Sequence, residues 1–295
     1  MRSRVLLVVA LLLGACSAPT SQPEASVPSD PPGTVSKPAA TTTTAPPATT
    51  TTVAPTTTTT NPYAWPDWMG KRPLPLRADG HGEVQPTPPE FVNRQLETPD
   101  LLGPAPMVGY EWSIEPIPPD VLARSSWVEE CPVTVDDLRY LTMTHVGFDG
   151  EFHIGEMIVN ASVADDVVEV FRKLFEARFP IELMRVITKE EIDAPPTGDW
   201  NDTTSFVCRP AVGSSSWSQH AYGLAIDVNP FHNPYLKGDL VLPELASAYV
   251  DREDVRPGMI FEGDVVTQAF DDMGWGWGGR WNTLKDWMHF SSNNR

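Results

Sequence analysis

The stretch that most constrains this chain is residues 218–227, which reads SQHAYGLAID. His220 and Asp227 stand seven positions apart, and the intervening residues are mostly small or apolar. Residues 224–228 alternate and are β-prone, which predicts a strand that carries Asp227 on one face. Gly223 permits a sharp turn or a close backbone approach just before that strand. His220 is therefore expected in the loop that leads into the strand, with its imidazole folded back toward Asp227.

An imidazole beside a carboxylate supplies two of the three protein ligands that a catalytic zinc site requires. A third candidate is His289, in the segment DWMHF at residues 286–290. Asp286 stands three positions before it, and a carboxylate close to a metal can accept the proton of an attacking water molecule. These residue types in this order predict a zinc-dependent hydrolytic site.

The pattern SxHxxGxAxD followed by DxxHF resembles the zinc D-alanyl-D-alanine carboxypeptidases of the VanY type. That group includes L-alanyl-D-glutamate endopeptidases and shares its fold with lysostaphin-like peptidases and the hedgehog signalling domain. The resemblance implies that His220, Asp227 and His289 hold one zinc ion and that Asp286 is the catalytic base. It also implies that the substrate is a peptidoglycan stem peptide. Some carboxypeptidases have Glu at the position of Asp286, so the shorter side chain leaves exo- versus endopeptidase action open.

Four further residues are weighed beside this motif. Arg209 ends a stretch similar to one in the family, and its guanidinium is a candidate for binding a substrate carboxylate or stabilising an oxyanion, with a surface salt bridge as the alternative. Ser218 is expected to orient the site by a hydrogen bond, since no GxSxG elbow surrounds it. His153 is expected to be structural or to line the cleft. His232 lies between two Asn-Pro turns, which predicts a surface loop in preference to a metal ligand.

The N-terminal part of the sequence predicts export. Residues 1–16 have a basic start and a short apolar stretch, as a secretory signal does, and residues 13–16 read LGAC, which resembles a bacterial lipobox with Cys16 as the lipidated residue. An ordinary signal peptide with a chance cysteine is the alternative. Residues 17–62 are almost entirely Thr, Pro, Ala and Ser, which predicts a disordered tether. Together they predict an exported bacterial lipoprotein on the outer face of the membrane, held by lipid alone and reaching the cell wall.

Cysteine count and charge add two expectations. With Cys16 assigned to lipid, Cys131 and Cys208 remain, and two cysteines in an exported chain predict one disulfide. A cysteine zinc ligand is disfavoured because the sequence has no CxxC. The net charge of −18 argues against nucleic-acid binding. No pattern indicates an oligomeric state.

The remaining patterns predict the architecture. Residues 63–124 are rich in Pro and Trp and are expected to form an irregular extension, in which Tyr63, Trp65, Trp68 and Trp112 pack across the domain. Residues 125–295 are expected to form one α+β domain, with a small, mainly antiparallel sheet and helices on one side. The expected strands include residues 140–146, 153–159 and 181–188 and a last strand that delivers Asp286 and His289, and the expected helices are residues 160–179 and 265–273. The glycines and tryptophans of residues 274–281 either form a cleft wall or close the core.

The function that the resemblance implies first is cleavage of D-Ala-D-Ala by a zinc carboxypeptidase. The alternatives are an L-Ala-D-Glu endopeptidase and a non-catalytic, zinc-containing module that binds the cell wall. In a third alternative, His220 and Asp227 are a buried hydrogen-bonded pair that binds no metal.

Overall fold

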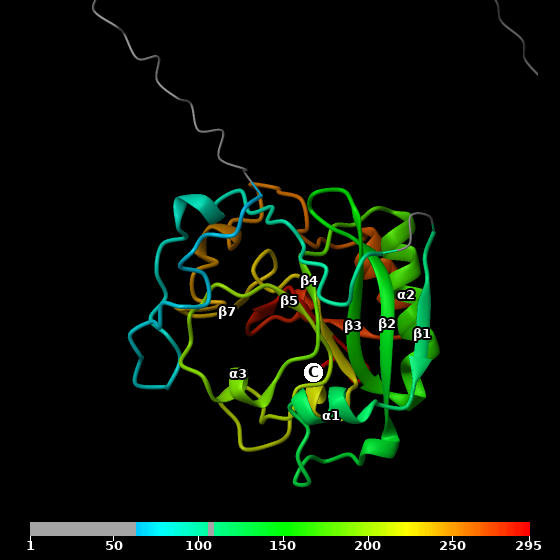
Figure 1. Ribbon diagram of the computed structural model, residues 1–295. Helices are drawn as coiled ribbons and strands as arrows, with labels where there is room; N and C mark the ends of the chain where they lie inside the picture. The colour runs from blue at the N-terminus through cyan, green and yellow to red at the C-terminus, as the bar shows by residue number, and fades with distance from the viewer. Residues whose placement is uncertain (1–62, 106–108) are drawn as a thin grey trace, which may run out of the picture. The chain divides into compact units, whose positions relative to one another are not determined.

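The computed structural model describes residues 63–105 and 109–295, which lie within one compact unit (Figure 1). The predicted signal sequence, Cys16 and the tether 17–62 lie outside the described residues. Helices mix with strands that pair mainly antiparallel, so the predicted α+β class is confirmed. Among the helices of the described part, none is long and apolar enough to cross a membrane.

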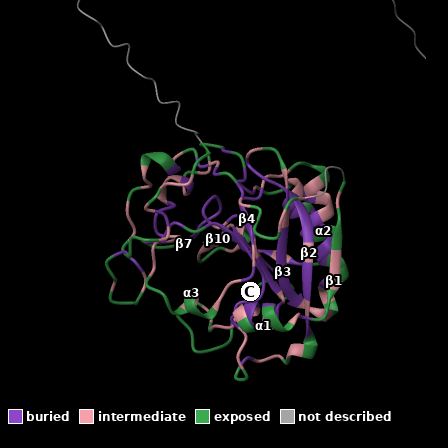
Figure 2. Ribbon diagram, in the orientation of Figure 1, coloured by how far each residue is buried: buried purple, intermediate pink, exposed green. Residues whose placement is uncertain are grey.

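The largest sheet has the order β1-β2-β3, with every pair antiparallel. Its strands are β1 (Trp112–Glu115), β2 (Leu138–Val146) and β3 (Phe152–Asn160). One face of the sheet places Leu141 and Met157 in a core shared with α2 (Ala164–Glu176) and α4 (Val265–Asp272). The opposite face packs Tyr140 and Ile158 in a second cluster. Most consecutive residues of β2 and β3 are buried (Figure 2). Since successive strand residues point to opposite faces, both faces of these strands are covered.

The helix α2 forms where the apolar residues recur at helical spacing. Asn160 begins the helical segment, since its Oδ1 accepts a hydrogen bond from Ser162 N at 3.1 Å. A short 3-10 turn follows, and α2 then buries Val167, Phe171 and Leu174 against the sheet. The predicted helix is therefore present, with a later start and an earlier end than residues 160–179.

Three small sheets complete the fold. One has the order β6-β11-β9, a second has β10-β7-β8, and a third pairs β4 with β5 in parallel. Their strands are β4 (Leu183–Met184), β5 (Asp202–Thr203), β6 (Ala225–Asp227), β7 (Tyr235–Lys237), β8 (Leu240–Leu242), β9 (Gly276–Trp277), β10 (Lys285–Asp286) and β11 (His289–Ser291). The expectation of one last strand for Asp286 and His289 is wrong, because β10 pairs with β7 whereas β11 pairs with β6 and β9.

The predicted strand at residues 181–188 is mostly absent. Only Leu183 and Met184 form a strand, although most of the segment is buried. Thr188 then starts the short helix α3 (Lys189–Asp193), because its side chain and that of Glu191 form a capping box. The segment is apolar because most of it is buried, but only two of its residues have a partner strand.

Short helices connect the sheets. They are η1 (Pro89–Phe91), α1 (Pro119–Arg124), η2 (Val135–Asp137), η3 (Ala161–Val163), η4 (Gln219–Tyr222), η5 (Ser247–Tyr249) and η6 (Gly278–Arg280). Of these, η4 carries His220 and therefore matters most for the site described below.

The segment before residue 125 packs into the same unit as the rest of the described chain. Arg94 and Glu182 form a fully buried ion pair, with Arg94 Nε donating to Oε2 at 2.8 Å and Nη2 to Oε1 at 2.6 Å. The guanidinium of Arg94 packs against the rings of Phe91 and Phe231, and its Cζ lies 4.4 Å from the centroid of each ring. β1 also belongs to the largest sheet, although Trp112 itself is 52% exposed. The extension is therefore part of the folded core.

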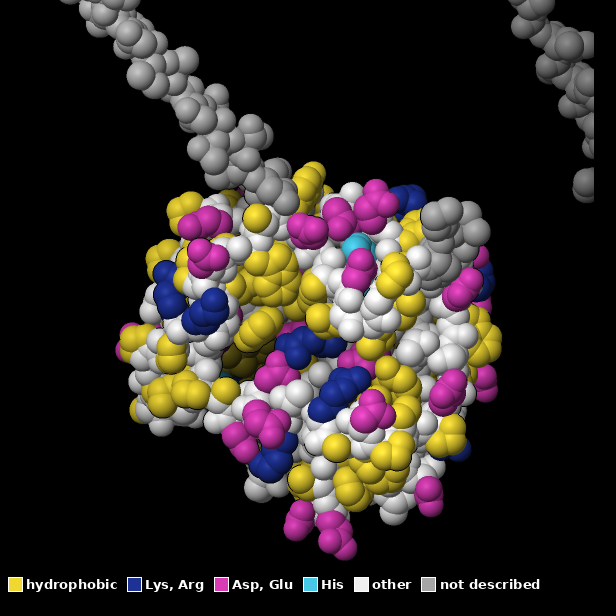
Figure 3. Space-filling view, viewed as in Figure 1, with side chains coloured by type: hydrophobic (Ala, Val, Ile, Leu, Met, Phe, Trp, Pro, Cys, Tyr) yellow, Lys and Arg dark blue, Asp and Glu magenta, His cyan; other side chains and the backbone are white. Residues whose placement is uncertain are grey.

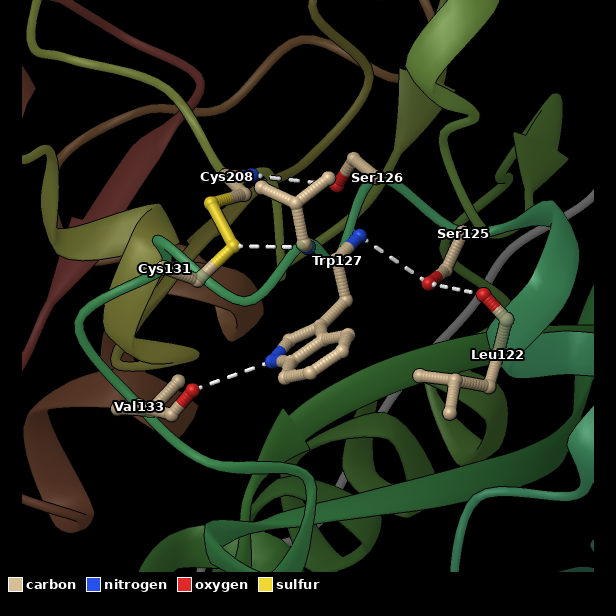
Figure 4. The surroundings of a disulfide bond; sticks show 8 residues. Leu122, Ser125, Ser126, Trp127, Cys131, Val133 and Cys208 are labelled. Carbon is tan, nitrogen blue, oxygen red and sulfur yellow. Dashed lines mark hydrogen bonds between the residues drawn. A yellow bond between two sulfur atoms is a disulfide. The ribbon is translucent and has the colours of Figure 1, made fainter.

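The predicted disulfide joins Cys131 to Cys208, with their Cα atoms 5.9 Å apart (Figure 4). Cys208 N donates to Ser126 Oγ at 3.2 Å, and Val128 N donates to Cys131 Sγ at 3.1 Å. The bond links the segment before β2 to the segment that leads toward His220. It thereby restrains the chain beside Arg209, the next residue after Cys208.

Replacing Arg94 by Met is expected to lower the free energy of unfolding by about 3–5 kcal/mol, because Glu182 is then left buried without its cation. Denaturant unfolding followed by tryptophan fluorescence measures this change. The matched control is Arg77→Met, which removes the exposed ion pairs of Arg77 with Asp79 and Asp239 and is expected to have little effect. Equal destabilisation by the two substitutions would contradict the role given to the buried pair.

Candidate metal centre and catalytic cleft

The backbone brings three candidate metal ligands together from three elements. His220 lies in η4, Asp227 ends β6 and His289 begins β11. In the antiparallel pair of β6 and β11, His289 lies directly opposite Asp227. Gly223 allows the turn from η4 into β6, since its φ is +66° and a Cβ there would lie 2.5 Å from Asn160 N. The predicted close approach at this glycine is thus against the end of β3.

The side chains of His220, Asp227 and His289 form a compact triangle, in which the two histidine nitrogens face different oxygens of the Asp227 carboxylate. His220 Nε2 lies 3.2 Å from His289 Nδ1 and 3.2 Å from Asp227 Oδ2, while His289 Nδ1 lies 3.0 Å from Asp227 Oδ1. Zinc bonds of about 2.0–2.1 Å at tetrahedral angles require ligand atoms about 3.3 Å apart. Two imidazole nitrogens and a carboxylate at these distances fit a zinc ion with an open coordination position.

The outer nitrogens of both imidazoles are engaged by backbone oxygens. His220 Nδ1 lies 2.6 Å from Ser205 O, and His289 Nε2 lies 3.1 Å from Arg295 O. A carbonyl only accepts hydrogen bonds, so each of these nitrogens carries the proton. His220 Nε2 and His289 Nδ1 then face the centre of the triangle, and their lone pairs become available to a metal once these two nitrogens have lost their protons.

Asp286 supplies an unpaired carboxylate in the same cleft. It ends β10 opposite Tyr235 of β7, and its Oδ1 is buried with no hydrogen-bond partner among the described residues. Burial raises the pKa of this carboxyl to about 7, against the positive charges of His289 and Arg209 and with the charge of Asp227 adding to the increase. A buried acceptor without a partner is the group that a water molecule or substrate in the cleft can satisfy.

Burial and charge act against each other within the triangle. Burial opposes ionisation of Asp227, but the charges and hydrogen bonds of His220 and His289 outweigh it and hold the pKa of Asp227 well below its ordinary value. Burial also favours neutral His289, whereas its hydrogen bond to Asp227 raises the pKa of His289 to about 9. The two histidines thus stabilise Asp227 as a carboxylate, the form in which it binds a cation.

The candidate ligands line a cavity of about 470 Å³, here called the metal cavity. Its walls include Ser218, Arg209, Trp217 and Trp281, and the ring of Trp281 lies 5.5 Å from that of His289. A second cavity of about 630 Å³, here called the apolar cavity, shares four lining residues with it, which are Arg209, Asp227, Leu242 and Met288. The two cavities therefore meet at a metal ligand and form one cleft.

The other predicted residues fall in different places. Arg209 lines both cavities, and Ser218 Oγ accepts a hydrogen bond from His220 N at 3.3 Å. His153 lies elsewhere, with Nδ1 at 2.9 Å from Asp100 and Nε2 at 3.2 Å from Asp149, and it lines neither cavity.

The expectation of a surface loop for His232 is wrong, since the residue is fully buried. Its Nδ1 lies 3.0 Å from Asn201 Nδ2, its Nε2 lies 3.0 Å from Arg94 O, and its ring stacks on Phe148. These partners satisfy the hydrogen-bonding capacity of both ring nitrogens, so His232 can be buried although the adjacent Asn-Pro turns predicted an exposed loop.

The tryptophans of residues 274–281 divide between the two expected roles. Trp275 and Trp277 are buried in the main core, and Trp277 Nε1 donates to Trp287 O at 2.8 Å. Trp281 instead lines the metal cavity. The sequence did not predict that the backbone carbonyl of Ser205 orients His220, because any residue type supplies a backbone carbonyl.

The site combines two imidazoles and a carboxylate, which are typical zinc ligands, with a further carboxyl group, that of Asp286. This combination is typical of metallopeptidases. A family model described as D-alanyl-D-alanine carboxypeptidase matches residues 212–292, a stretch that contains all three candidate ligands and Asp286. No curated protein and no solved structure matches the chain. The match supports a peptidase, and within that class it supports the family of zinc D-Ala-D-Ala peptidases.

Replacing His220 by Ala is expected to weaken zinc binding by roughly 100-fold or more, because even the loss of a group that only supports a ligand weakens binding by about 10- to 100-fold. Zinc content per chain and competition with a chelating dye measure the affinity. His153→Gln is the control and is expected to keep wild-type affinity, since its partners are Asp100 and Asp149. Wild-type protein that takes up no zinc would support the alternative of a metal-free hydrogen-bonded pair.

Proposed function

We propose that this chain is a zinc-dependent peptidase that cleaves peptidoglycan stem peptides, with the terminal D-Ala-D-Ala bond as its first candidate. The observation that carries the proposal is the triangle of His220, Asp227 and His289, whose facing nitrogen and oxygen atoms lie 3.0–3.2 Å apart as zinc ligands can. Beside it lies Asp286, whose Oδ1 is buried without a hydrogen-bond partner among the described residues. The family match over residues 212–292 supports the choice of substrate. A hedgehog-like arrangement of the domain is part of the same proposal.

In this proposal His220, Asp227 and His289 hold the ion through the three atoms described above. Bound zinc supplies Lewis-acid chemistry, which polarises a scissile carbonyl and lowers the pKa of water. Asp286 accepts the proton of the attacking water and passes it to the departing amine. Its buried position suits both steps, since a raised pKa makes the carboxyl a better proton acceptor and then a donor near neutral pH.

Arg209 and Ser218 are assigned supporting roles. Arg209 stands where the two cavities meet, so its guanidinium can bind a substrate carboxylate there or stabilise the developing oxyanion. Ser218 caps η4 and holds His220 in place through the backbone hydrogen bond of its hydroxyl. His153 is assigned a structural role because of its two aspartate partners.

A second candidate is cleavage of an internal bond such as L-Ala-D-Glu. The observation that favours it is the continuation of the cleft past Asp227 into the apolar cavity, which offers more room than one terminal alanine needs. A zinc-containing module that binds the wall without turnover is the rival from a different class. Asp286 argues against it, since a binding site has no need of an acid whose Oδ1 is buried without a hydrogen-bond partner among the described residues.

The cellular setting is proposed from the sequence alone. Lipidation of Cys16 would hold the protein at the outer face of the membrane, and the tether of residues 17–62 would let the peptidase reach the wall.

Asp286→Asn is expected to lower kcat by about 100- to 10,000-fold while zinc stays bound, because it removes the general base and keeps the shape of the side chain. The purified, zinc-loaded protein is incubated with muropeptides, and mass spectrometry identifies the products. Loss of one terminal D-Ala identifies the carboxypeptidase, and cleavage between L-Ala and D-Glu identifies the endopeptidase.

The matched control for that experiment is Asp251→Asn, which makes the same change at an exposed carboxylate and is expected to keep full activity. Full activity of Asp286→Asn would contradict its role as base. One zinc per chain with no cleavage of any muropeptide by the wild-type protein would favour the binding module.

A further inference from the structure

The apolar cavity is built largely by segments outside the stretch that matches the peptidase family. Outside that stretch its lining comes from residues 70–73 and 187–209, and inside it from residues 227–230, 242–244 and 288. Figure 3 shows the surface hollowed between α3 and β7, with hydrophobic side chains inside and charged side chains at the edge. This cavity meets the metal cavity at Asp227, so a substrate that reaches the candidate metal ligands has room to place a neighbouring side chain in it.

Most of the cavity wall is hydrocarbon. Trp200 is 37% exposed, and Ile187, Ile192, Pro196 and Pro243 also line the cavity. Trp200 is fixed by close packing, since a Cβ on Gly70 would lie 2.6 Å from its ring. Such a wall favours an extended apolar stem over a fully polar group.

One carboxylate of the lining differs from the others. Asp202 has both oxygens on Arg185, Glu191 binds Arg185 and Thr188 N, and Asp199 accepts from Gly70 N and Thr197 Oγ1. Glu244, in contrast, has one oxygen on Gly82 N at 2.8 Å, and its other oxygen has no hydrogen-bond partner among the described residues.

Glu244 also has no cation within ion-pair distance in the described part of the chain, although it is only 4% exposed. Buried carboxylates are normally paired with a positive charge because an unpaired one is costly to desolvate. Lys71 lines the same cavity but lies in its exposed part, and Arg209 lies at the junction with the metal cavity. The cavity thus combines an apolar wall with a buried carboxylate that has a free oxygen.

We propose that the apolar cavity binds an alkyl-ammonium side chain of the peptide substrate, a primary amine on a short hydrocarbon stem as in lysine. The stem packs on Trp200 and Pro243, and the ammonium donates to Glu244. An ammonium group fits better than an anion because the lining carboxylates outnumber the lining cations. The proposal rests on the proposed function of the adjacent metal centre, and it makes Glu244 a residue that determines substrate choice.

The test compares two synthetic stem peptides that end in Lys-D-Ala-D-Ala, one with a free lysine amine and one with an Nε-acetylated lysine. Calorimetry measures their binding to zinc-loaded protein carrying Asp286→Asn, which leaves the peptides intact. The free-amine peptide is expected to bind about 10- to 100-fold more tightly, the range for a hydrogen bond to a charged group. Acetylation removes the charge and keeps the stem.

Glu244→Gln in the same background is the decisive variant. The amide oxygen still accepts from Gly82 N, so the fold is retained, while the negative charge is lost. The variant is expected to bind both peptides with the weaker affinity and to unfold at the same temperature as its parent. In protein that keeps Asp286, the substitution is expected to raise KM for the free-amine peptide with little change in kcat. Glu253→Gln, at an exposed glutamate, is the matched control and is expected to keep the preference.

Equal affinity of the two peptides for the parent protein would overturn the proposal. So would an equal loss of affinity for both peptides in Glu244→Gln, which would assign Glu244 a structural role. The proposed function fails by a separate result, the absence of cleavage of any muropeptide by the wild-type protein. The binding preference is measurable in either case because it needs no turnover.

Discussion

The antiparallel pairing of β6 with β11 is the constraint on which the site depends. Its register places His289 directly opposite Asp227, and a shift by one residue would turn the two side chains to opposite faces. The neighbouring Ile226 and Phe290 are fully buried in the main core, so the hydrophobic packing that stabilises the domain also fixes this register. The candidate metal centre is therefore held by the core, and its ligands need no flexible loop to meet.

The rest of the cleft depends on contacts between distant segments. The buried pair of Arg94 and Glu182 joins the N-terminal part of the described chain to the segment that leads into α3, and Arg94 Nη1 also donates to Asp199 O at 2.6 Å. Asp199 also accepts a hydrogen bond from Gly70 N, and both residues line the apolar cavity, so these contacts help to shape it. The extension thus contributes to the site, because it builds one wall of the cleft beside the metal cavity.

Several features of the fold followed from local pattern. Short apolar runs at residues 140–146 and 153–159 indicated β2 and β3, which are buried on both faces, and helical spacing indicated α2 and α4, which bury one face. The segment 181–188 shows the limit of this reasoning. Its apolar residues are buried as expected, but strand formation needs a hydrogen-bonding partner that only the assembled fold supplies, and β5 pairs with two residues of it.

The sequence by itself determined which residue types the candidate site contains, because the spacing of His220, Gly223 and Asp227 and the late pair of Asp286 and His289 specify candidate ligands and a local turn. Tertiary structure alone decided which groups surround them. His232 is buried beside Arg94, Ser205 orients His220 through a carbonyl, and Glu244 lines the cavity next to Asp227. These relations join residues far apart in the chain, and long-range packing leaves no periodic signal in sequence.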